Sequence, residues 1–183
     1  MKEKNKGVVS FQKAYFSVCA KLDKMLGVLL NVLLCVLVLD VCWQVFSRFF
    51  LTQPSSVTEE LARYLLIWIG LLGAAHAYRQ RMHLGIDLLV VKLKGAQRKA
   101  AVFVIHCCCA FFAVSIFILG GGNLMLMTLE LHQLSASLNI PMAVVYLSLP
   151  ISGLMMLMFS VEFLMKDRLD SGAMLSTRTK AGF

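Results

Sequence analysis

The 183-residue chain is 59% hydrophobic and only 15% charged, with a mean hydropathy of +0.78. A soluble domain carries about 25% charged residues, and a small one cannot hide this much apolar surface. These values exclude a soluble globular protein and predict an all-α integral membrane protein, because a segment in lipid must satisfy its own backbone hydrogen bonds. The net charge of +8 lies in blocks beside apolar runs, so we expect membrane lipids and no nucleic acid as partners.

The sequence contains no pattern typical of an enzyme or a metal site. It has no C-x-x-C pair and no G-x-S-x-G, H-E-x-x-H or Walker A motif. Most of the six cysteines fall within apolar runs and are interpreted as small apolar residues. We therefore expect no catalytic residues, no metal site and no cofactor in this chain.

Four apolar runs are long enough to cross about 30 Å of hydrocarbon at about 1.5 Å per residue. They cover residues 25–50, 59–81, 99–128 and 141–166. Pro150 removes one backbone hydrogen bond and should kink the fourth run.

The basic residues predict how these spans are oriented. Six lysines precede the first span. Six basic residues lie from Arg79 to Lys99, in the loop between the second and third spans and at the span ends beside it, and four lie from Lys166 to Lys180, at the end of the fourth span and after it. Only Arg48 and Arg63 fall on the opposite side. The positive-inside rule then predicts that both termini lie in the cytoplasm.

Two further segments have the apolar periodicity of amphipathic helices on the cytoplasmic surface, namely residues 1–24 and an arm near residues 84–98. Each can instead be a helical extension of the neighbouring span. Residues 25–166 then form the transmembrane domain. Residues 167–183 form a cytoplasmic tail, which we expect to be disordered after Asp170 because it is polar and lacks periodicity.

The second span carries the most informative pattern. At 100° per residue, one narrow face gathers an i, i+4 ion pair and several small residues, which would let another helix approach closely in lipid. These residues are Glu59, Arg63, Gly70, Ala74, Ala77 and Arg81, and Gly73 adjoins them. A neighbouring stripe of Glu60, Tyr64 and Trp68 begins at the outer interface, where aromatic side chains anchor helices. The pattern predicts a docking face for another membrane protein, although packing within this chain would use the same features.

Asp40 lies inside the first span and shares a face with Gln44 and Ser47. A carboxylate at this depth costs about 2.5–3.5 kcal/mol, so we expect Asp40 to turn towards protein. We favour a structural polar contact over a proton or ion site, because Glu162 lies near the cytoplasmic end of the fourth span and no second acid stands in mid-membrane. A small self-sufficient carrier or proton channel using Asp40 is one alternative function.

Two histidines raise a different alternative. His76 and His106 are both expected towards the cytoplasmic side, where a four-helix membrane protein could ligate a b-type haem. A membrane redox subunit that binds haem or quinone is therefore a second alternative function.

The second-span motif also resembles a known family. The run E-E-L-A-R-Y-L-L-I-W from Glu59 to Trp68, the small residues after it, and H-L-G-I-D from His83 to Asp87 are similar to the small membrane subunit (DctQ-like or SiaQ-like) of tripartite ATP-independent periplasmic (TRAP) transporters. Arg48 and the segment 138–150 support the resemblance, which covers roughly residues 20–165.

This resemblance implies a role that spacing alone does not show. In the family, a periplasmic binding protein captures an organic acid such as sialic acid or a C4-dicarboxylate, and a large multi-span subunit carries it inward with sodium. The small subunit braces the scaffold of the large one in the bacterial inner membrane. The second-span residues named above, together with Arg48, then become the expected contact with the large subunit, and sodium is expected in that partner.

Overall fold

The computed structural model describes the backbone of residues 2–50, 56–80 and 96–180, and the side chains of residues 12–50, 56–80, 97 and 100–166. These ranges are almost entirely helical, since helices satisfy their backbone groups internally. The elements are α1 (Lys2–Phe50), α2 (Ser56–Arg79), α4 (Ala96–Phe112), the π-helix η1 (Ala113–Gly120), α5 (Gly121–Glu130), α6 (Met142–Tyr146) and α7 (Ser148–Lys180).

Four helical segments are long and apolar enough to cross a bilayer, and they match the four predicted spans. They are Gln12–Phe50, Ser56–Arg79, Ala100–Glu130 and Met142–Lys166. The prediction of an all-α membrane protein with four spans is confirmed, so the chain is a multi-pass membrane protein.

The ends of the chain differ from the sequence-based expectation. α1 is continuous from Lys2 to Phe50, so residues 2–24 extend the first span as one helix, as in the alternative interpretation. α7 runs to Lys180, so the expectation of disorder after Asp170 is wrong. No proline follows Pro150, and helix propagation adds one hydrogen bond per residue. The predicted arm near residues 84–98 lies outside the described residues, apart from its end at the start of α4.

The third and fourth spans each contain one irregularity. α4 passes through η1 into α5 without a break, which gives one long span. In the fourth span the helix is interrupted at Leu147, between α6 and α7. This interruption lies three residues before Pro150, which has no N–H to donate to the carbonyl group of Tyr146.

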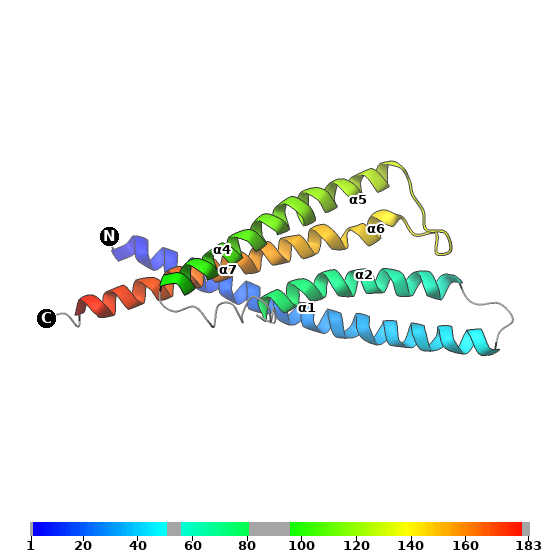
Figure 1. Ribbon diagram of the computed structural model, residues 1–183, viewed down its shortest axis with the longest axis horizontal. Helices are drawn as coiled ribbons and strands as arrows, with labels where there is room; N and C mark the ends of the chain where they lie inside the picture. Colours follow the sequence, from blue (N-terminus) through cyan, green and yellow to red (C-terminus); the bar gives the residue numbers. More distant parts are fainter. Residues whose placement is uncertain (1, 51–55, 81–95, 181–183) are drawn as a thin grey trace.

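The spans form an open row and do not close into a bundle. α1 packs on α2, α2 packs on α7, and α7 packs on α4 and η1 (Figure 1). Within the described residues, the backbone of α1 does not approach α4, η1 or α5. The start of α1 and the end of α7 lie at the same end of the molecule (Figure 1). A row of this kind has no central space shared by all four spans.

The apolar core lies where α1, α2 and α7 meet. Its buried members are Cys19, Leu26, Leu72, Ala75, Tyr78, Phe159 and Phe163. In the four spans, only 11–33% of the apolar stretch is buried inside the chain. The core therefore joins three helices towards the end of the molecule that carries the termini, and lipid or another protein must cover the rest.

α1 meets its neighbours through a seam with a mean spacing of 3.5 residues. The seam consists of Cys19, Asp23, Leu26, Leu30, Leu33, Leu37, Asp40, Gln44 and Ser47. All of them are buried or half-buried. Alternating steps of four and three residues are typical of left-handed helix packing at a shallow crossing angle. Four of the nine residues are polar or charged: Asp23 lies near one end of the seam, and Asp40, Gln44 and Ser47 form the other end.

A tight contact between the third and fourth spans yields the first testable prediction. A Cβ atom on Gly153 would lie 2.5 Å from Cβ of Phe117 and 3.1 Å from the carbonyl oxygen of Ala113. Gly153→Ala should therefore destabilise the protein by about 1–3 kcal/mol through overpacking. Thermal unfolding in detergent, followed by tryptophan fluorescence, measures the shift. Gly122 has nothing within 4 Å of such an atom, so Gly122→Ala serves as the control and should leave Tm equal or slightly higher. Equal Tm values for both variants and the wild type would contradict the predicted close packing.

Candidate partner-binding surface

The outward face of α2 carries a stripe of small and charged residues. Its positions follow steps of four and three residues, as in a helix-packing seam. The stripe consists of Glu59, Arg63, Leu66, Gly70, Gly73 and Ala77. The first four are exposed, while Gly73 and Ala77 are half-exposed, as is the adjoining Ala74. The described part of the chain therefore leaves Glu59, Arg63 and Gly70 of the predicted docking face exposed and covers the remaining small residues only in part.

The glycines of this stripe leave room for close approach. A Cβ atom built on Gly70 or on Gly73 would meet nothing within 4 Å. In lipid no hydrophobic force draws helices together, so close backbone packing at small residues is one of the main sources of association. This geometry suits the backbone of a second helix.

The charged end of the stripe is exposed. Arg63 and Glu59 form an i, i+4 pair at 3.5 Å, and each side chain is 66% exposed. An exposed pair of this kind contributes at most a few tenths of a kcal/mol to stability. Arg48, at the end of α1, is also exposed. These three side chains remain accessible to a partner.

The neighbouring stripe of Glu60, Tyr64 and Trp68 is engaged within the chain. The Glu60 carboxylate accepts hydrogen bonds from the backbone N–H groups of residues 136, 137 and 138, at 3.2, 2.8 and 3.1 Å. Tyr64 donates to Glu60 at 2.6 Å and also contacts the sulfur of Met142 at 3.3 Å. Trp68 packs against the apolar core. These three residues therefore make their contacts within the chain. From Glu59 onward, the exposed residues of α2 all belong to the stripe of small and charged residues.

The loop that Glu60 holds is itself ordered by backbone pairing. Ser135 and Ile140 share a hydrogen bond of 2.9 Å, and Met142 donates to the carbonyl group of Gln133 at 2.9 Å. His132 and Asn139 adopt positive φ angles of 47° and 52°, which reverse the chain direction. Three converging N–H groups form a site for an anion, and Glu60 supplies that anion from α2. We call this contact the Glu60 latch.

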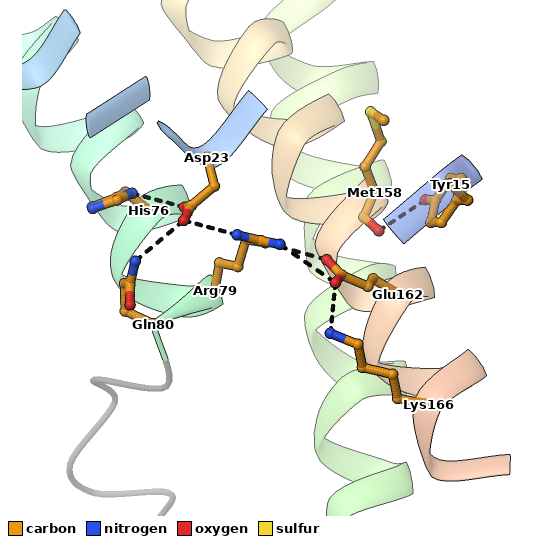
Figure 2. A network of polar contacts seen from close by, with 8 residues as sticks. All are labelled: Tyr15, Asp23, His76, Arg79, Gln80, Met158, Glu162 and Lys166. Atoms are coloured by element: carbon orange, nitrogen blue, oxygen red, sulfur yellow. Dashed lines mark hydrogen bonds and ion pairs between the residues drawn. The ribbon is translucent and has the colours of Figure 1, made fainter. Parts of the chain in front are cut away.

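At the opposite end of α2, Arg79 joins three helices (Figure 2). Its guanidinium lies 2.8 Å from Oδ2 of Asp23 on α1 and donates to both carboxylate oxygens of Glu162 on α7, at 3.2 and 3.4 Å. Lys166 lies 2.7 Å from Glu162, whose side chain is 1% exposed. Two carboxylates therefore balance two cations, the condition under which buried ions are tolerated. We call these four residues the Arg79 network.

Further polar groups surround this network. His76 Nδ1 lies 2.9 Å from Oδ1 of Asp23, and the side-chain amide of Gln80 donates to Oδ2 of the same carboxylate at 3.2 Å. The Tyr15 hydroxyl donates to the carbonyl oxygen of Met158 at 2.9 Å (Figure 2). These contacts add α1–α2 and α1–α7 links beside the salt bridges.

Sequence reasoning did not find the Arg79 network. It assigned Arg79 and Lys166 to membrane orientation and placed Glu162 near a span end without a role. One signal was present, because Asp23 occupies the same periodic stripe as Cys19 and Leu26. A carboxylate on an apolar stripe indicates a buried ionic partner.

Asp40 turns towards protein, as predicted, and is only 8% exposed. Its Oδ2 is buried and has no hydrogen-bond partner among the described residues. Gln44 is half-buried, and its backbone carbonyl oxygen accepts a hydrogen bond of 2.9 Å from the hydroxyl group of Ser47. The structure thus confirms the orientation of Asp40 and supplies no polar contact for its Oδ2.

The two candidate haem ligands have separate protein partners. His76 lies against Asp23, whereas the Tyr78 hydroxyl lies 2.7 Å from Nδ1 of His106. Phe163 stacks on the His106 ring at a centroid distance of 4.9 Å. Each imidazole is therefore fixed by a different set of neighbours, and nothing in this arrangement favours a shared bis-histidine site. No group of three or more potential metal ligands occurs in the described part of the chain.

The sequence of the chain matches the family model described as tripartite ATP-independent periplasmic transporters, DctQ component, over residues 23–169. The chain belongs to this family. The match covers all four spans, and the resemblance based on the second-span motif is confirmed. A DctQ component is a transporter subunit, so this chain is not an enzyme.

Two curated relatives agree with this membership. A putative TRAP transporter small permease protein of Haemophilus influenzae is 25% identical over 134 residues, which span 73% of this chain and 81% of that protein. The C4-dicarboxylate TRAP transporter small permease protein DctQ of Rhodobacter capsulatus is 32% identical over 98 residues. That match spans 54% of this chain and 43% of the relative. This DctQ chain is therefore a TRAP small permease subunit.

The Arg79 network yields the second prediction. Arg79→Leu would leave two buried carboxylates, Asp23 and Glu162, with Lys166 as the one remaining cation of the network. Removing one partner of a buried ion pair lowers the free energy of unfolding by about 3–5 kcal/mol. We expect a large fall in Tm in detergent, or loss of the folded protein from the membrane fraction. Arg63→Leu removes an equally charged but exposed residue of the same helix and should change Tm little. Similar Tm values for the two variants would contradict the structural role of the network.

Proposed function

We propose that this chain is the accessory subunit that braces the large membrane subunit of a sodium-coupled TRAP transporter for organic acids. The complex lies in the bacterial inner membrane and receives its substrate from a periplasmic binding protein. Sodium and substrate bind in the large subunit, and this chain carries neither. Both termini face the cytoplasm, as the basic residues predict.

The observation that carries this proposal is the uncovered small-residue stripe on α2. Gly70 and Gly73 face open space at a depth where only lipid or another membrane protein is available. Another helix would gain close packing there that lipid chains cannot reproduce. The open row of helices supports the same role, since a row offers a broad surface to a neighbour and no shared interior for a substrate.

The contact also has charged groups available at its outer end. Arg48, Glu59 and Arg63 are exposed near the loops that join the spans. At such a position, charges influence the choice and register of a partner more than the affinity. The proposed interface therefore comprises these three residues together with Gly70, Gly73, Ala74 and Ala77.

A reconstitution experiment tests the proposed function. The purified chain should not move labelled succinate or sialic acid into proteoliposomes under an inward sodium gradient, whereas the complex with its large subunit and binding protein should move its own substrate. Omission of sodium should abolish uptake by the complex. Uptake by this chain alone, above that of protein-free liposomes, would contradict an accessory role.

A substitution at the stripe tests the docking surface. Gly70→Leu fills the open space on α2 and should reduce the amount of large subunit that co-purifies, by about tenfold for a loss of about 1.4 kcal/mol. The variant should still insert and retain its Tm, because no atom of the described residues, apart from the adjoining backbone of α2 itself, lies within 4 Å of the new Cβ. Gly122→Leu is the matched control, because Gly122 on α5 also has open space around its Cβ position. Undiminished co-purification of Gly70→Leu would exclude this face as the contact.

A further inference from the structure

α1 carries an amide that lacks a partner inside the bilayer. Asn31 is exposed, and no hydrogen bond from its side chain to the described residues exists. At 1.5 Å per residue, it lies about 12 Å along α1 from Asp23 and about 25 Å from Arg48, well inside the apolar span. Hydrocarbon offers no hydrogen-bonding group, so an unpaired amide at this depth carries a free-energy cost.

The packing of α1 on α2 places this amide beside the open stripe. A Cβ atom on Gly27 would lie 3.5 Å from Cε1 of His76, so this side of α1 borders α2. Asn31 follows Gly27 by one helical turn on the same side. Because the two helices are antiparallel, the turn of α2 that precedes His76 lies at the same level, and it contains Gly73. Nothing occupies the 4 Å around the Cβ position of Gly73.

Asn31 also begins an exposed seam on α1. The positions Asn31, Leu34, Val38, Val41 and Val45 alternate steps of three and four residues, and all of them are exposed. Leu34 is 49% exposed and Val38 is 54% exposed. One asparagine among β-branched residues, with leucine at the intervening position, is typical of the packing of two helices, in which the asparagine sets the register.

We infer that Asn31 forms an interhelical hydrogen bond with one transmembrane helix of the large subunit, which packs along the junction of α1 and α2. That helix presents a polar side chain or a free backbone carbonyl group at the level of Gly73. The inference rests on the proposed function and adds α1 to the interface. The large subunit is the occupant that fits, because one helix in this position would cover both the amide and the adjoining open stripe of α2.

Replacement of the amide tests the hydrogen bond. Asn31→Leu should reduce co-purification of the tagged large subunit by about threefold, the ordinary value of an interhelical hydrogen bond in a membrane. The double variant Asn31→Leu with Cys35→Asn moves the amide one turn along α1 and should not restore the loss. Asn123→Leu removes an exposed amide from α5, on the other edge of the row, and should have no effect. An equal loss with Asn123→Leu, or none with Asn31→Leu, would overturn the inference.

A photo-crosslinking amino acid identifies the occupant. Placed at Leu34 on the seam, it should capture the large subunit, whereas at Leu39, which is 70% exposed on another side of α1, it should capture no protein. Capture of a second copy of this chain, or of no protein at Leu34, would overturn the assignment. If Gly70→Leu disrupts the complex while Asn31→Leu and the Leu34 crosslink fail, the proposed function stands and this inference alone is wrong. If the wild-type chain retains no large subunit, the proposed function itself fails.

Discussion

The Arg79 network is the constraint on which the rest of the structure depends. Asp23, Arg79 and Glu162 are largely buried where the helices meet, and each of these ions is tolerated there only while its partner stays in place. Since Asp23, Arg79 and Glu162 come from α1, α2 and α7, their pairing fixes three helices near the end of α2 that carries Arg79. At the opposite end of α2, the Glu60 latch ties this helix to the loop before α6.

Clamping at both ends fixes the rotation of α2 about its own axis. Tyr64, Trp68 and Arg79 point towards the chain, so the stripe that includes Gly70 points away from it. A helix that is free to rotate would turn small residues inward as readily as outward. The polar contacts therefore orient the proposed docking surface outward as well as stabilising the fold.

The open arrangement has a direct functional consequence. Ligand and cofactor sites in helical membrane proteins form between facing helices, and the outer helices of this row do not face each other. Much of the apolar surface is left for lipid or protein to cover. This open arrangement is consistent with the bracing role proposed above for this DctQ component, in which its outer surface makes the contact.

The sequence by itself determined the membrane class, the four spans and the small-residue pattern of α2, because these depend on local composition and on periodicity along one helix. The family came from the resemblance of the second-span motif to known small permease subunits, and the family model confirmed it. It could not determine which face of α2 is covered, so Glu60, Tyr64 and Trp68 were grouped with an interface although they contact the chain's own loop and core. Helix-wheel positions give angles around one axis and say nothing about which neighbour occupies each direction. Only the tertiary structure paired Arg79 with acids from two other helices, and among the described residues it left Asn31 exposed and without a partner, because the row is open on that side.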